Sequence, residues 1–101
     1  MSKQIVITLP PVINRSEAEA FVRELHEAEA APEAVIILDC RRVEYLNSRA
    51  VSALVESCKN LSCDRRLRLV EPGDFMLKTL EVVGLLSLLD VYPSLAEAAV
   101  Q

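Results

Sequence analysis

The sequence contains few glycines and a single histidine, and this scarcity excludes several kinds of catalytic site. The two glycines are Gly73 and Gly84. Phosphate-binding loops and dinucleotide-binding motifs each need several glycines at fixed spacing, so neither motif is present. His26 has no nucleophile at a matched spacing, so no catalytic triad is indicated. We therefore expect a binding module that has no cofactor and is not an enzyme.

Basic runs and aromatic residues are also scarce. The formal net charge is -4, and aromatic residues make up 4% of the chain, with no tryptophan. Nucleic acids and anionic membranes attract basic surfaces, so neither is expected as a partner. No apolar stretch approaches the roughly 18 residues of a membrane span, and the start of the chain has no signal-peptide pattern. We expect a cytoplasmic protein.

The three cysteines do not form a recognisable disulfide or zinc pattern. Cys40, Cys58 and Cys63 are an odd number, and no export signal accompanies them. Disulfides are rare in such a context, and the spacing of the three thiols matches no zinc motif. We expect no metal site, and Cys58 is predicted to be a small buried residue.

The order of apolar and polar segments predicts alternating strands and helices in one domain that spans residues 1–101. Half of the chain is hydrophobic (51%), which is enough for one core. Strands are expected at residues 3–9, 35–39, 67–70 and 90–92, with one strand before the first helix. Helices are expected to follow each strand. This order predicts an α/β layered fold, with a mostly parallel sheet of about four strands covered by about four helices.

The predicted helices have recognisable ends. Ser16 and Glu19 form a capping-box pattern at the first helix, and Ser94 and Glu97 form another at the last. Asp74 is expected to cap a third helix that carries Phe75, Met76, Leu80 and Val83. Gly84 follows that helix, where a left-handed conformation is favoured.

The segment at residues 35–61 is the centre of this pattern. Its first part is a continuous apolar run closed by Asp39, which is typical of a strand buried on both faces. A short apolar piece at residues 43–46 follows, and Asn47 is a favoured N-cap for the next helix. At 100° per residue, one stripe of that helix is apolar. The stripe contains Val51, Leu54, Val55, Cys58 and Leu61, whereas Arg49, Ser52, Glu56 and Lys59 lie opposite.

Ser48 lies outside this stripe, on the first turn of the predicted helix. The first turn presents unpaired amides and the positive end of the helix dipole, both of which favour a phosphate group. We therefore consider Ser48 a candidate phosphoacceptor with a hydroxyl that solvent or a protein can reach. Serine is also common at helix starts for structural reasons, and the residues alone favour that simpler interpretation.

The central segment, VIILDCRRVEYLNSRAVSALVESCKNL, resembles the core of STAS domains, the fold of bacterial anti-sigma factor antagonists. That core has an apolar strand ending in Asp, an apolar pair, Asp-Ser, a small residue and Gly, and then an amphipathic helix. Residues 67–99 also resemble the family, so the resemblance covers nearly the whole chain. Three positions depart from the pattern. Asn47 replaces Asp, which keeps the cap but removes a charge, and Arg49-Ala50 replaces the small residue and Gly.

The resemblance implies a function. In this family an anti-sigma factor with serine kinase activity phosphorylates the serine of the motif, and the unphosphorylated antagonist binds that kinase and frees a sigma factor. Carried over, the phosphoacceptor is Ser48. The partner-binding residues are expected to be Asn47, Ser48, Arg49, Ser52 and Glu56.

Two other interpretations remain open. STAS domains also act as accessory subunits of lipid-transport ATPases, or as scaffolds of signalling assemblies, and the same helix would then dock a partner without phosphorylation. A small enzyme that uses Asp39 or Cys40 at the strand end is a third interpretation, although no acid–base partner can be named for either residue.

Overall fold

Four parallel strands form the central sheet of the computed structural model, which describes residues 3–31, 34–61 and 65–99. In spatial order the strands are β1 (Gln4–Thr8), β3 (Val35–Asp39), β5 (Arg68–Val70) and β6 (Asp90–Tyr92). All three neighbouring pairs are parallel. The predicted α/β fold with a mostly parallel sheet is confirmed.

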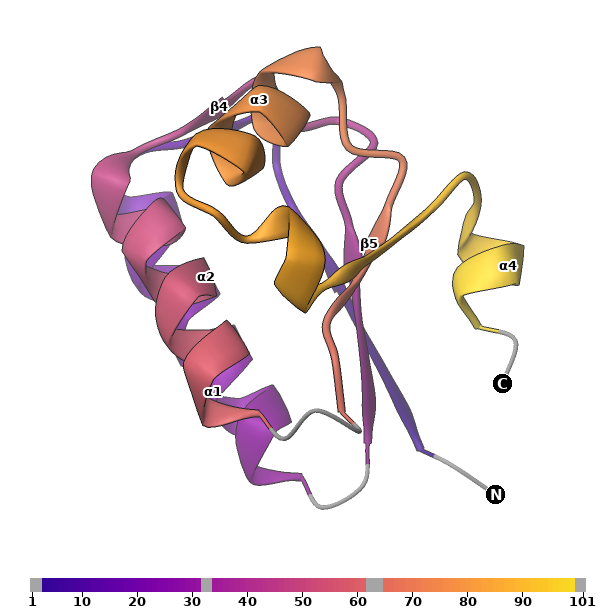
Figure 1. The fold of residues 1–101 in the computed structure, drawn as a ribbon. Helices are drawn as coiled ribbons and strands as arrows, with labels where there is room; N and C mark the ends of the chain where they lie inside the picture. Colours follow the sequence, from indigo (N-terminus) through magenta and orange to yellow (C-terminus); the bar gives the residue numbers. More distant parts are fainter. Residues whose placement is uncertain (1–2, 32–33, 62–64, 100–101) are drawn as a thin grey trace.

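The helices cover the two faces of this sheet unequally (Figure 1). Buried side chains of α1 (Arg15–Ala30), α2 (Ser48–Asn60) and α3 (Asp74–Val82) share one core with the strands, and the short 3-10 helix η1 (Leu86–Leu88) follows α3. The short α4 (Leu95–Ala98) packs against the other face, where Ala98 contacts a small cluster around Ile37 and Val70. Strand β3 therefore has apolar neighbours on both sides, as its continuous apolar run predicts.

A second sheet consists of two short parallel strands, β2 (Val12–Ile13) and β4 (Tyr45–Leu46). The prediction of a single strand before the first helix was therefore wrong, because Pro10 and Pro11 interrupt the extended chain without ending it. Each of these strands leads directly into a helix, β2 into α1 and β4 into α2. The pairing thus places the first turns of α1 and α2 beside each other.

Two of the predicted helix starts are also wrong. Helix α1 begins at Arg15 with Asn14 as its N-cap, and the capping box joins Asn14 to Glu17 instead of Ser16 to Glu19. The pairing of β2 keeps the chain extended only up to Ile13, so the helix can begin immediately after Asn14. Gly73 is the N-cap of α3, and Asp74 lies in its first turn. The Ser94 cap of α4 is confirmed, as is the left-handed Gly84 after α3.

The buried face of α2 is rotated relative to the predicted apolar stripe. The buried residues of this helix are Ala50, Ala53, Leu54 and Ser57. Only Leu54 belongs to the predicted stripe, whose other members are half-buried at the edge of the core. Ser57 is buried, and its hydroxyl donates a hydrogen bond to the Glu29 carboxylate on α1, which offsets the cost of burying it. The predicted polar side, Arg49, Ser52, Glu56 and Lys59, is exposed.

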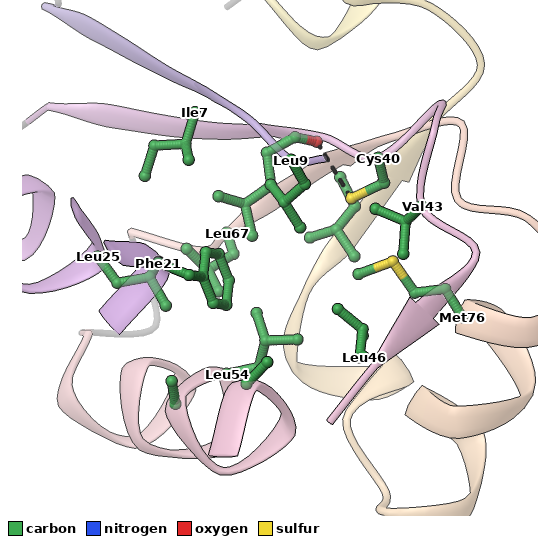
Figure 2. Packing of buried hydrophobic residues seen from close by; sticks show 14 of the residues in the cluster. Ile7, Leu9, Phe21, Leu25, Cys40, Val43, Leu46, Leu54, Leu67 and Met76 are labelled. Carbon is green, nitrogen blue, oxygen red and sulfur yellow. Dashed lines mark hydrogen bonds between the residues drawn. The ribbon is translucent and has the colours of Figure 1, made fainter. Parts of the chain in front are cut away.

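Leu54 is the residue of α2 that contributes most to the core. Figure 2 shows its side chain pointing from the helix into the cluster that contains Phe21 of α1 and Leu46 of β4. It is fully buried, with 0% of its surface exposed. Its apolar contacts therefore hold α2 on the sheet.

We expect Leu54→Ala to lower the free energy of unfolding by about 2–5 kcal/mol, because truncation of a buried leucine leaves a cavity. The matched control is Ser48→Ala on the exposed start of the same helix, which should cost less than about 0.5 kcal/mol. Urea denaturation of the two variants measures both values. Similar losses for the two variants would contradict this description of the α2 face.

Candidate functional site

The start of α2 is held by three hydrogen bonds of Asn47. Its side-chain oxygen accepts from the Ala50 amide at 2.9 Å, and its carbonyl oxygen accepts from the Val51 amide at 3.1 Å. Its own amide donates to the carbonyl oxygen of Ile13 at 3.0 Å, just beyond the β2–β4 pair. The predicted N-cap is therefore confirmed, and it also joins α2 to the strand that precedes α1.

Ser48 is the first residue of α2 and is exposed. Among residues 3–31, 34–61 and 65–99, none forms a hydrogen bond with its hydroxyl group. The hydroxyl therefore has no structural task within that part of the chain.

The adjacent starts of α1 and α2 differ in charge. In α1, Glu17 lies in the first turn and accepts a hydrogen bond from the Asn14 amide at 3.0 Å. The hydrogen bonds to the backbone amides of Glu17 and Asn14 lower the pKa of Glu17, so its charge opposes the positive end of the α1 dipole. The first turn of α2 contains no acidic residue. Its positive end is therefore left without a carboxylate of its own.

Arg49 and Glu19 join the exposed sides of these two helix starts. The Arg49 Nε donates to Glu19 Oε1 across the α1–α2 contact, and 57% of each side chain is exposed. Ser52 and Glu56 follow at four-residue intervals from Ser48, so these three side chains lie along one exposed line of α2. The structure thus places the predicted site residues on one surface, with the half-buried Asn47 at its end.

An apolar surface beside this site was missed by the sequence analysis. Tyr45 of β4 stacks on Phe75 of α3, with ring centroids 6.1 Å apart, and both side chains are nearly half exposed. Val12 is the β2 partner of Tyr45, and Val82 and Val83 share an open groove with Phe75. We call these five residues the apolar surface. The alternation in β4, where Leu46 is buried and Tyr45 is not, was the available signal.

Asp39 and Cys40, the two residues of the enzyme interpretation, are both engaged in contacts within the fold. The Asp39 carboxylate accepts from Arg41 Nε at 2.9 Å and Nη2 at 2.7 Å, and these hydrogen bonds lower its pKa. Cys40 is fully buried, its thiol donates to the Leu38 carbonyl oxygen at 3.4 Å, and burial raises its pKa to about 12. The thiol is therefore protonated near neutral pH and is a poor nucleophile.

The described residues also bear on the predictions about metal sites, cysteines and membrane spans. In residues 3–31, 34–61 and 65–99, no three histidine, cysteine or acidic side chains are grouped so that they could hold a metal ion. Cys63 lies outside these residues. Cys58, predicted to be buried, is only half-buried. In the same ranges, no helix has the length and apolar character needed to cross a membrane.

Comparison with known proteins gives one family and one set of similar folds. Residues 3–98 match the model of the STAS domain family. The unphosphorylated form of the anti-sigma factor antagonist SpoIIAA has 19% sequence identity and a TM-score of 0.74, over 98% of this chain and 87% of that chain. The phosphorylated form of the Bacillus cell fate determinant SpoIIAA has 20% identity and a TM-score of 0.75, over 97% and 89%.

A third similar structure is an anti-sigma-factor antagonist (STAS) domain protein from Planctomyces limnophilus. It has 20% identity and a TM-score of 0.71, over 92% of this chain and 84% of that chain. No curated protein shows significant sequence similarity to this chain. At these identities the solved structures establish the fold that the chain shares with them.

We expect Asp39→Asn to destabilise the fold at neutral pH because the ion pair with Arg41 is lost. The lowered pKa of Asp39 means that its ionised form contributes stability above its usual value of 3.8, and that this contribution disappears as the pH falls through the lower pKa of the folded protein. The difference in unfolding free energy between wild type and variant should therefore shrink below about pH 4. Urea denaturation from pH 7 to pH 2 measures it.

The control for this series is Glu44→Gln, which removes an exposed carboxylate in the following loop. Its effect on stability should be small at every pH. A loss in Asp39→Asn that stays constant from pH 7 to pH 2 would show that the charge of Asp39 does not stabilise the fold.

Proposed function

Because the chain belongs to the STAS domain family, we propose that it is an anti-sigma factor antagonist-like regulator that binds a serine-kinase-type anti-sigma factor in the cytoplasm. The unmodified protein binds through the start of α2 and the apolar surface. Phosphorylation of Ser48 by the same partner ends the binding. The protein itself catalyses no reaction.

The observation that carries this proposal is the exposed Ser48 hydroxyl at a helix start that has no acidic residue. A phosphate group brings a charge of about −1.5 to −2 at neutral pH, together with strong hydrogen-bond acceptors. The Ala50 amide is already capped by Asn47, but the amides of Ser48 and Arg49 have no acceptor within the helix, so they can donate to these oxygens. The fold of α2 therefore tolerates the phosphate, whereas a protein surface complementary to a neutral serine does not.

The apolar surface supports a protein as the partner. Tyr45 lies three residues before Ser48, and its ring continues through Phe75 to the groove along α3. Contiguous exposed apolar residues mark interaction sites, and aromatic side chains are enriched in protein interfaces. Binding across this surface would bury Tyr45 and Phe75 while placing Ser48 at the border of the contact. A charge added there would act directly on the bound partner.

The departures from the family motif support a second candidate. Arg49 stands where the family motif has a small residue, and it is paired with Glu19. A site with this built-in charge pair could dock a lipid-transport ATPase or a signalling scaffold without any phosphorylation. The two candidates share the same surface and differ in whether a charge at position 48 matters.

A pull-down from native cell extract separates these candidates. Tagged wild type, Ser48→Ala and Ser48→Asp are used to capture proteins, which mass spectrometry then identifies. We expect wild type and Ser48→Ala to capture a serine-kinase-type anti-sigma factor, and Ser48→Asp to capture at least tenfold less, as expected for a loss of about 1.4 kcal/mol or more in binding.

Two further variants serve as controls. Ser87→Asp adds the same charge to an exposed serine of η1 and should capture as much partner as wild type. Phe75→Ser removes the aromatic centre of the apolar surface and should weaken capture even with Ser48 intact. Capture of a transporter ATPase, or equal capture by wild type and Ser48→Asp, would contradict the phosphorylation switch.

A further inference from the structure

The Arg49 guanidinium has hydrogen-bond donors that are not used within the described fold. Its Nε is bound to Glu19 on α1, and both side chains are more than half exposed. In the part of the chain that the structure describes, its two terminal nitrogens have no hydrogen-bond acceptor. Arg49 also directly follows Ser48 in the first turn of α2. A cation with unused donors therefore lies next to the predicted phosphoacceptor.

The existing ion pair is weak enough to be exchanged. Exposed pairs between arginine and a carboxylate contribute about 0–1 kcal/mol, since water competes for both groups. A phosphoserine carries more charge than a carboxylate, and arginine binds phosphate through two parallel N–H donors. Neighbouring side chains on a helix diverge by about 100°, so the Arg49 side chain must rotate to reach position 48. Its exposure leaves room for that rotation.

We propose that Arg49 is the internal counter-charge of phosphorylated Ser48, and that phosphorylation exchanges its partner from Glu19 to the phosphate. This inference rests on the proposed function, because it needs phosphate at Ser48. Before modification the charges of Arg49 and Glu19 compensate each other. Afterwards Arg49 holds the phosphate against the helix start, and the Glu19 carboxylate is released beside it. The partner then meets two negatively charged groups, one from each helix.

The test measures the second pKa of the phosphate by phosphorus NMR. Phosphoserine is incorporated at position 48 during translation, so that neither the kinase nor the binding partner is needed. The full chain is compared with Arg49→Gln and Glu19→Gln, while Arg15 and Glu17 at the neighbouring helix start are left unchanged. A nearby cation stabilises the dianion and lowers this pKa, which is about 6 for phosphoserine.

We expect Arg49→Gln to raise the phosphate pKa by about half a unit or more, since a cation at about 4 Å contributes roughly 1 kcal/mol even in water. Glu19→Gln should lower it, because this change removes the competitor for Arg49 and a repelling charge. Lys59→Gln is the control: it removes one positive charge from the last turn of the same helix and should have little effect.

A phosphate pKa that changes no more in Arg49→Gln than in Lys59→Gln would overturn the proposal. So would a pKa that Glu19→Gln leaves unchanged. Because the phosphoserine is encoded, these outcomes are independent of the proposed function. If NMR shows that Arg49 moves from Glu19 to the phosphate, but the partner binds the phosphorylated and unmodified chains equally, the phosphorylation switch is refuted. The proposed exchange of partners by Arg49 would still stand.

Discussion

The parallel pairing of β2 with β4 is the constraint on which the site depends. Only two residues of each strand take part, yet the pairing sets the places where both α1 and α2 begin. The Asn47 amide extends it by donating to Ile13, and the Asn47 side chain then caps α2. One short backbone ladder therefore fixes the position of Ser48 relative to α1. It also positions Tyr45, which lies in β4 two residues before the cap and stacks on Phe75.

This arrangement makes two similar helix starts electrically different. The α1 start has Glu17 in a capping box, so its dipole is opposed by a carboxylate. The α2 start has a serine hydroxyl at the equivalent turn, and Arg49 is engaged with Glu19 on the neighbouring helix. A phosphate at Ser48 would supply the negative charge that this start lacks. The same group would disturb a partner bound across α2 and the apolar surface. In the proposed switch, the negative charge of the phosphate therefore both stabilises the start of α2 and weakens the binding of the partner.

The sequence was sufficient where a local pattern and the tertiary structure favour the same conformation. Strand β3 was predictable because its apolar run matches burial on both faces, and the Asn47 cap because its side chain acts on its own helix. Strand β2 was not predictable, because its two residues follow two prolines, show no alternation of apolar and polar residues, and pair only with a distant segment. The α2 face was misplaced because the buried Ser57 depends on Glu29. Arg65 likewise binds four carbonyl oxygens between Ala28 and Ala34, at and just after the end of α1, through contacts that no local pattern indicates.

The most direct test of this account is the affinity of the captured anti-sigma factor for two forms of the intact chain, unmodified and with encoded phosphoserine at position 48. Isothermal titration calorimetry measures both affinities, and thermal unfolding of each form shows that α2 is still folded. We predict binding by the unmodified chain and at least tenfold weaker binding, a loss of about 1.4 kcal/mol or more, by an equally stable phosphorylated chain. Equal affinities for the two folded forms would contradict it, because the charge at the start of α2 would then have no effect on the partner.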